Sequence, residues 1–274
     1  MRGVIARAEQ IEARVADRFG VKLEGLRILD IGAGQRLLQM KYFSQKNEVV
    51  GIDRDVVIQG LDLRGYLHMF RTNGLKRAVK TAGRKVLRID SSQSRELGRM
   101  LGVERFPTLE VHQMDAAKLR FADDSFEFVY SLAVLPHLEQ PENAIAEIAR
   151  VLASGGIANV DFILYTSRTG SHDIRLLGGR AAELPIWAHL RPQHETLVQP
   201  SAYLNKLRLG DWKRLFSELM PGSEVGTETA EEWVETEARR LKEEGDLADY
   251  SLEELITTKV VVLWQKPASA EAVV

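Results

Sequence analysis

The stretch LRILDIGAGQ, residues 26–35, decides the fold of this chain. A short apolar run climbs to Asp30, then breaks at Gly32-Ala33-Gly34 before a helical pattern, RLLQMKYF, resumes. This order predicts a buried parallel strand, a tight glycine turn and the start of a helix. Glycine lets a ligand approach the backbone closely, and a helix N-terminus offers free N–H groups. The stretch suits a nucleotide-type cofactor, although alone it is equally compatible with a plain tight turn.

Two later segments strengthen this interpretation. EVVGIDRD, residues 48–55, predicts a second apolar strand that ends in Asp53. This acid follows the glycines by roughly 20 residues, a spacing at which it can hydrogen-bond ribose hydroxyls. The third segment spans residues 112–162 and begins HQMDAAKLRF. In this order, residues 26–164 resemble the class I S-adenosylmethionine-dependent methyltransferases of the small type 11 group.

The resemblance implies S-adenosylmethionine as the cofactor and places its site at successive strand ends. The glycine turn with Asp30 would line the methionine end, and Asp53 would hold the ribose. Asp115 and the Ala116 backbone would meet the adenine, while Ser131 would close the pocket. The family often has a third glycine where this chain has an arginine, which leaves the path of the loop open. The expected cofactor-binding set is Asp30, Gly32, Ala33, Gly34, Asp53, Arg54, Asp115, Ala116 and Ser131.

Composition bounds the remaining possibilities. The 274 residues are 45% hydrophobic, which is enough for one large domain with a lid. No cysteine is present, which excludes disulfides, cysteine-ligated metals and radical S-adenosylmethionine chemistry. The net charge of −2 offers no basic surplus for nucleic acid. No apolar run is long enough for a membrane span or a signal peptide, so we expect a cytoplasmic protein.

The periodicity predicts a single α/β domain over residues 1–274. Strands alternate with helices, so we expect a Rossmann-like, mainly parallel, seven-stranded sheet covered by helices on both faces. Gly155-Gly156 is expected to end the helix over 142–152. Residues 54–108 exceed an ordinary crossover and predict a helical insertion. The expected strands cover 26–31, 48–53, 108–113, 126–132, 157–165, 223–229 and 259–266, and the expected helices cover 3–19, 142–152, 211–220 and 230–244.

Residues 166–212 lose periodicity, gain Pro and Gly, and hold three of the six histidines. Such a segment predicts a lid that binds the acceptor, with Gly178-Gly179 giving flexibility. His172 beside Asp173 could serve as a general base near neutral pH, or the two could be a solvated loop pair. Two further residues have two open interpretations each: His137 packs or lines the site, and Trp187, near His189, stacks on the acceptor or anchors the lid.

The expected catalytic candidates are therefore His172, Asp173, His137 and His189, and no metal is expected because the histidines lack a ligand spacing. Methyltransferases that modify adenine or glutamine nitrogens carry Asn/Asp-Pro-Pro-Tyr after the fourth strand. This chain has SLAV at residues 131–134, which favours O-methylation of a small polar acceptor, a saccharide or hydroxylated secondary metabolite. The alternatives are a non-catalytic binding module and a nicotinamide reductase, whose fingerprint would need glycine at Leu37.

Overall fold

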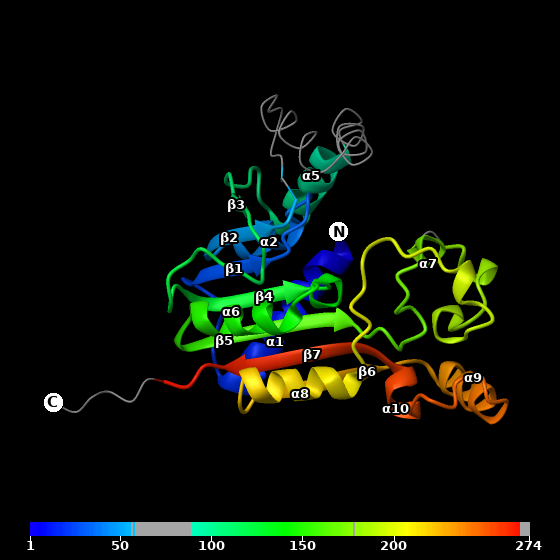
Figure 1. Cartoon of the computed structure of the whole chain (residues 1–274). Coiled ribbons are helices and arrows are strands. Elements are labelled where there is room, and N and C mark those ends of the chain that lie inside the picture. The colour runs from blue at the N-terminus through cyan, green and yellow to red at the C-terminus, as the bar shows by residue number, and fades with distance from the viewer. Residues whose placement is uncertain (56, 58–88, 178, 269–274) are drawn as a thin grey trace. The chain divides into compact units, whose positions relative to one another are not determined.

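A computed structural model describes residues 1–55, 57, 89–177 and 179–268 of the chain (Figure 1). The chain forms two compact units. Unit 1 comprises Met1–Tyr130, Glu147–Ala158 and Gln265–Val274, and unit 2 comprises Ser131–Ala146 and Asn159–Trp264. Most of the predicted insertion at 54–108, and Gly178 of the predicted hinge, lie outside the described residues. The division into a single domain with insertion and lid stays a prediction.

A seven-stranded sheet confirms the predicted fold class. Its strand order is β3-β2-β1-β4-β5-β7-β6, and Figure 1 lets the strands be followed in this order. The β1–β2 and β2–β3 pairs are parallel, whereas β6 pairs with β7 antiparallel. The strands are β1 (Arg27–Ile31), β2 (Glu48–Asp53), β3 (Glu110–Gln113), β4 (Phe126–Leu132), β5 (Leu152–Ile163), β6 (Glu224–Thr229) and β7 (Thr257–Gln265).

The helices follow the predicted periodicity. In α1, Ala8, Ile11 and Val15 recur at helical spacing and are buried. Gly20, in the left-handed conformation, ends this helix, as expected because glycine has no Cβ atom to clash there. The helices are α1 (Arg2–Phe19), α2 (Leu38–Phe43), α5 (Ile89–Leu101), α6 (Pro141–Val151), α7 (Ile174–Leu177), α8 (Leu209–Leu219), α9 (Glu232–Glu243) and α10 (Leu252–Ile256).

The prediction for Gly155-Gly156 was wrong. Helix α6 ends at Val151, and β5 begins at the next residue and runs through both glycines. Gly155 has φ +77° and donates its N–H to the Lys266 carbonyl, while the Lys266 N–H donates to Gly156. The pair therefore permits an irregular strand start rather than a helix cap. The short helix α10 was also missed, although Ser251 and Glu254 form a capping box at its start.

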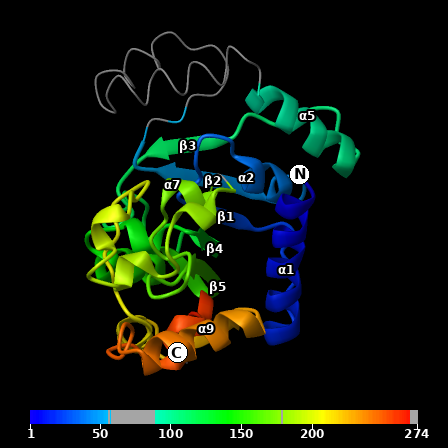
Figure 2. The same ribbon diagram turned by 90° about the vertical axis from the view of Figure 1, so that its right-hand side faces the viewer.

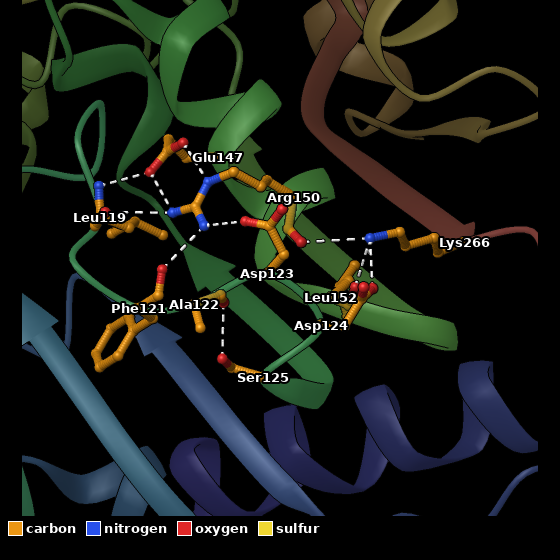
Figure 3. Close-up of polar contacts among 10 residues, drawn as sticks. All are labelled: Leu119, Phe121, Ala122, Asp123, Asp124, Ser125, Glu147, Arg150, Leu152 and Lys266. Carbon is orange, nitrogen blue, oxygen red and sulfur yellow. Dashed lines mark hydrogen bonds and ion pairs between the residues drawn. The ribbon is translucent and has the colours of Figure 1, made fainter. Parts of the chain in front are cut away.

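Unit 1 contains a cluster of ion pairs around the turn that precedes β4 (Figure 3). Arg150 contacts Glu147 at 2.8 Å and Asp123 at 2.6 Å, and it also donates to the Phe121 carbonyl. Lys266 contacts Asp124 at 2.8 Å and donates to the Leu152 carbonyl at 2.7 Å. The two aspartates therefore lie in a turn before β4, as the sequence predicts.

Unit 2 contains the segment 166–208, which Figure 2 shows as loops and short turns in green and yellow. Its short elements are α7 and three 3₁₀ turns at Ala181–Glu183, Ala188–Leu190 and Glu195–Leu197. Trp187 anchors this segment in a buried cluster. The other members are Leu190, Val234, Ala238, Leu241, Leu247 and Leu255. Among the helices that the structure describes, none is long and apolar enough to span a membrane.

Candidate functional site

The glycine turn after β1 is held against the end of β2. The backbone N–H groups of Gly32 and Ala33 both donate to the Ile52 carbonyl at 2.9 Å. Gly32 and Gly34 have φ values of +85° and +65°, a backbone conformation that glycine adopts without a steric penalty. The Gly34 N–H donates to Asp53 Oδ2 at 2.9 Å. The turn and the end of β2 therefore form one hydrogen-bonded unit.

Gly51 of β2 lies under this turn. A Cβ atom on Gly51 would lie 2.7 Å from the Met40 Sδ and 3.0 Å from the Ala33 Cβ. Both distances are shorter than ordinary van der Waals contact, so a larger residue here would require Met40 and the turn at Ala33 to shift. Leu37, immediately before α2, has φ +53°. The helix therefore begins later than predicted, because a left-handed residue separates it from the glycines.

Asp30, at the end of β1, is a buried carboxyl group. It is 4% exposed and accepts a 2.7 Å hydrogen bond from the Tyr130 hydroxyl of β4. Burial, opposed by the Tyr130 hydrogen bond and assisted by the nearby Asp53, raises the pKa of Asp30 to about 7. Among the described residues, no cation forms a salt bridge with Asp30. Asp30 is therefore a buried carboxyl without a counter-charge from the described residues.

The other residues of unit 1 that the sequence predicts to bind the cofactor lie at or beyond the ends of β2 and β3. Asp53 is half-buried, and its Oδ1 accepts the Asp55 N–H at 2.8 Å. The Met114 N–H donates to the Asp53 carbonyl at 2.9 Å, which brings the chain after β3 beside the end of β2. In this set Ala116 is buried, whereas the side chains of Arg54 and Asp115 are exposed.

Ser131 lies in β4 and belongs to unit 2. Its side chain is fully buried. The predicted role of Ser131 in closing the cofactor pocket stays a prediction.

His137 and His172 lie together within unit 2. Their ring centroids are 4.7 Å apart in an edge-to-face arrangement, and His137 Nδ1 lies 2.8 Å from the Tyr203 carbonyl oxygen. His172 has φ +48°, and its Nε2 atom is buried without a hydrogen-bond partner among the described residues. Burial, with a smaller effect from His137, lowers the pKa of His172 to about 4. His172 is therefore neutral at physiological pH and has a free nitrogen.

Within the described part of the chain, the Asp173 carboxylate makes no hydrogen bond with the imidazole of the neighbouring His172. Its fully buried carboxylate accepts two hydrogen bonds from the Arg175 guanidinium, at 2.7 and 2.8 Å. The backbone N–H groups of Arg175 and Gln199 donate two more, at 2.9 and 2.6 Å. The Arg175 guanidinium holds the pKa of Asp173 well below its usual range. This geometry favours a role for Asp173 in fixing the lid, and its predicted catalytic role stays a hypothesis.

Trp187 and His189 lie in the buried part of the same segment. Trp187 is 1% exposed, and its indole N–H donates to the Thr166 carbonyl at 3.1 Å, which favours anchoring over stacking on an acceptor. His189 Nε2 lies 2.8 Å from the Tyr165 carbonyl oxygen. Burial lowers the pKa of His189 to about 4. The His189 ring is thus neutral, and its Nε2 atom is already in contact with the Tyr165 carbonyl.

A polar pocket of about 700 Å³ lies beside His189 in unit 2. Tyr165 and Tyr250 line it, and Arg208 lies 4.9 Å from the centroid of the Tyr250 ring. Arg208 also forms an ion pair with the buried Glu254. No local spacing in the sequence connects Tyr165, Arg208 and Tyr250, because the fold brings them together from distant positions.

No group of three or more His, Asp or Glu side chains with metal-binding geometry occurs in the part of the chain that the structure describes. Tyr130 is the functional candidate that the sequence analysis missed in unit 1. It precedes the predicted Ser131 by one residue, and its contact with Asp30 spans 100 positions of the chain. The apolar strand pattern around it, FEFVYSL, carries no signal for such a contact.

The model of a family described as "Methyltransferase domain" matches residues 72–160. A phosphatidylethanolamine N-methyltransferase from Cereibacter sphaeroides is 29% identical over 136 residues, half of each chain. An uncharacterized 37.1 kDa protein in transposon TN4556 of Streptomyces fradiae is 38% identical over 82 residues. Those residues are 30% of this chain and 24% of that protein, so this chain spans at most half the length of either relative.

Solved structures with a similar fold include an S-adenosylmethionine-dependent methyltransferase from Mesorhizobium loti. The TM-score is 0.46 at 15% identity, over 89% of this chain and 92% of that one. A second solved structure is phosphoethanolamine N-methyltransferase 2 of Haemonchus contortus in complex with S-adenosyl-L-methionine. Its TM-score is 0.48 at 17% identity, over 94% of this chain and 52% of that one.

Residues 72–160, less than half of the chain, match the methyltransferase family. The order of the seven strands agrees with the class I S-adenosylmethionine-dependent methyltransferase fold that the sequence motifs predict. S-adenosylmethionine is the cofactor of this class.

Proposed function

We propose that this chain transfers a methyl group from S-adenosylmethionine to a hydroxyl of a small polar acceptor, a saccharide or a hydroxylated secondary metabolite. The main observation that supports S-adenosylmethionine as the methyl donor is the buried Asp30 carboxyl beside the left-handed glycine turn. A buried carboxyl without a protein cation is costly to ionise, and a cationic ligand would remove that cost. The α-amino group of the donor's methionine end has this charge.

Residues of unit 1 would hold the donor. Asp30 would pair with the methionine end, and the turn at Gly32 and Gly34 would let the donor approach the backbone. Asp53, which already accepts the Gly34 and Asp55 N–H groups, would also accept hydrogen bonds from the ribose hydroxyls. The sulfonium of the bound donor would supply an activated methyl group. Asp115 and Ala116 would meet the adenine, and Arg54 and Ser131 complete the proposed set.

Residues of unit 2 would prepare the acceptor. His172 would accept the hydroxyl proton at Nε2, the buried atom that has no partner among the described residues. His137 would orient that ring from the side, since it is itself fixed by the Tyr203 carbonyl. Asp173 would act as a positioning residue that holds the backbone after His172 through Arg175. His189 remains the reserve candidate for the base.

N-methylation is the second candidate. A relative named for phosphatidylethanolamine N-methylation matches half of this chain, which favours an amine acceptor. The segment SLAV after β4, in place of Asn/Asp-Pro-Pro-Tyr, supports the hydroxyl acceptor instead. An amine must also lose a proton before attack, so the proposed role of His172 is compatible with either acceptor. A small-molecule acceptor without nucleic acid, and a cytoplasmic location, remain part of the proposal.

Two measurements test the proposal. Isothermal titration calorimetry should detect binding of S-adenosylhomocysteine and none of NADH, and the reverse result would refute the donor assignment. Binding without turnover in any acceptor screen would support the non-catalytic module.

The screen uses a donor labelled in its methyl group against sugars, phenols and primary amines. Mass spectrometry of the product locates the label. Label on oxygen supports the proposal, whereas label on nitrogen or carbon contradicts O-methylation and leaves the donor site unaffected.

A further inference from the structure

Unit 2 contains a second pocket, which the proposed methyl transfer does not use. Its volume is about 530 Å³, within the range of small-ligand sites. Segment 176–188 supplies most of its wall, and α9 supplies Trp233, Thr236 and Glu237. The wall is mainly apolar: it contains Leu176, Ala181, Leu184, Pro185, Ile186 and Trp187. An apolar chain or ring of a ligand would therefore be removed from water there.

One positive charge lies at this pocket. Arg168 lines it and stacks over the ring of Trp233, with the guanidinium carbon 5.2 Å from the ring centroid. No carboxylate lies within salt-bridge distance of Arg168 among the residues that the structure describes. Stacking on an indole leaves the in-plane N–H groups of a guanidinium able to donate to an anion.

The other ionisable groups of the wall are already compensated. Glu237 forms two hydrogen bonds with Arg240, at 2.6 and 2.9 Å, and this contact lowers the pKa of Glu237. His189 is buried and neutral at physiological pH, because burial lowers its pKa to about 4. Arg240, which does not line the pocket, balances the charge of Glu237, so Arg168 is left as the charge of the described lining without an ion-pair partner.

Trp233 supports the same conclusion. It is 52% exposed, although large aromatic side chains contribute most when they are buried. Its indole N–H donates to Glu231 at 2.7 Å, which fixes the ring beside Arg168. A fixed, exposed indole with a stacked guanidinium forms the rim of a site that a ligand can cover.

We propose that this pocket binds a single amphipathic anion, whose apolar chain or ring lies against the wall of 176–187 and whose carboxylate or phosphate pairs with Arg168. The proposal does not depend on methyl transfer, since all of the lining residues belong to unit 2 and none is assigned to the donor or to proton removal, apart from His189 as the reserve base.

Calorimetry on the full chain without methyl donor tests this site directly. Dodecanoate and dodecyl phosphate, each below its micelle-forming concentration, serve as the two anionic probes. Dodecyltrimethylammonium serves as the cationic probe with the same chain length. We expect micromolar dissociation constants for one or both anions and at least about tenfold weaker binding of the cation, since a charge pair typically contributes that factor. The two anionic probes distinguish a carboxylate from a phosphate ligand.

Variants then assign the contacts. Arg168→Gln should weaken binding of the anion about tenfold and leave the cation unchanged. Ala181→Phe should fill the pocket and abolish binding of both probes, with the melting temperature showing that the variant folds. Arg239→Gln is the matched control, because Arg239 lies on α9, pairs with Glu235 and does not line the pocket. This control should bind as the unmodified chain does.

Three results would overturn the proposal. The first is equal affinity for the anionic and cationic probes. The second is unchanged anion binding in Arg168→Gln. The third is binding to vesicles of anionic phospholipid without binding of either monomeric anion, which would assign the surface to a membrane instead. S-adenosylhomocysteine binding, measured on the same protein, keeps failure of this site distinct from failure of the donor site.

Discussion

Two buried aspartates, one in each unit, have opposite electrostatic environments. Asp30 of β1 receives one hydrogen bond, from a neutral tyrosine, and burial raises its pKa to about 7. Asp173 of the lid segment receives three hydrogen bonds from Arg175 and one from Gln199, and its pKa is held well below the usual range. Both side chains are almost inaccessible to solvent.

The difference separates a binding group from a structural one. Asp173 already has its counter-charge, so it can stabilise the fold but has little capacity for a ligand. Asp30 lacks a counter-charge within the described structure, which destabilises the ligand-free fold at neutral pH. Such strain is typical of a site that a ligand completes. The four predictions below test this contrast between the proposed donor region in unit 1 and the proposed lid in unit 2.

The largest effect is expected in the lid. His172→Ala should lower turnover by roughly 10²–10⁴ while donor affinity stays unchanged, because the proposed base is lost and the donor residues are untouched. Steady-state kinetics with labelled donor, together with calorimetry of S-adenosylhomocysteine, measures both quantities. His194→Ala, a substitution in the same segment, is the control and should retain full turnover. Full turnover of His172→Ala would transfer the role to His137 or His189.

The pH profile sharpens the same test. The sequence alone predicts loss of activity below the ordinary histidine pKa, near 6.5. Because burial lowers the pKa of His172 to about 4, the group stays neutral and able to accept a proton down to that pH. Turnover that depends on His172 should therefore fall only as the pH approaches 4. A decline centred near 6.5 would indicate a more exposed histidine.

The second largest effect concerns stability. Asp173→Asn should destabilise the fold by about 3–5 kcal/mol at pH 7, because Arg175 would remain largely buried without its partner. The depressed pKa means that this stability is present above the ordinary aspartate pKa and is lost as the pH falls through the folded value. The difference between the two proteins should therefore shrink in strong acid. Urea unfolding measures it.

The exposed pair of Arg180 and Glu183 provides the matched control. Glu183→Gln should change the free energy of unfolding by less than about 1 kcal/mol, as for surface ion pairs in general. Equal effects of Glu183→Gln and Asp173→Asn would show that burial does not govern the lid pair.

Asp30→Asn should have the opposite effect on the free energy of unfolding from Asp173→Asn. Ionised Asp30 costs stability in the folded state, so the amide should stabilise the protein by about 2–3 kcal/mol at pH 8. The contribution of the protonated carboxyl is fully present below the unfolded pKa and is lost as the pH rises through about 7. The gain should therefore shrink as the pH falls and become small only below the ordinary aspartate pKa. The same variant should bind S-adenosylhomocysteine more weakly, and a destabilised variant at pH 8 would contradict the proposed strain.

The smallest effect is expected at Asp53. Asp53→Ala should weaken donor binding by about 1–3 kcal/mol, because the proposed ribose contacts and the Gly34 N–H would lose their acceptor. Calorimetry with S-adenosylhomocysteine measures the change. Asp53→Asn keeps an oxygen acceptor and should recover part of the affinity. Unchanged affinity in both variants would exclude this carboxylate from the donor site.

The sequence predicted the central strands more accurately than the segments around them. Strands β2 and β4 have the predicted bounds, because buried parallel strands form continuous apolar runs that glycine or acidic residues end. The helix boundary at Gly155-Gly156 was wrong, because a glycine pair permits a strand irregularity as well as a cap. What selects the strand is the pairing of Gly155 and Gly156 with Lys266, which no local pattern reveals.

The site residues divide in the same way. The turn at Gly32 and Gly34 and the position of Asp53 follow from local spacing, and the structure brings them into hydrogen-bonding contact. The contact of Asp30 with Tyr130, and the stacking of Arg168 on Trp233, join residues 100 and 65 positions apart. Such contacts depend on tertiary packing, for which a single sequence holds no periodic signal.

Gly51 extends the donor site to a residue that no ligand is expected to touch. One added methyl group there would press on Met40 and Ala33, and Ala33 belongs to the glycine turn. The flexible methionine can move aside, but the turn is fixed by its bonds to Ile52. In a library of variants selected for retained methyl-donor affinity, position 51 should therefore tolerate fewer substitutions than the exposed Asp115, although only the latter is proposed to contact the cofactor.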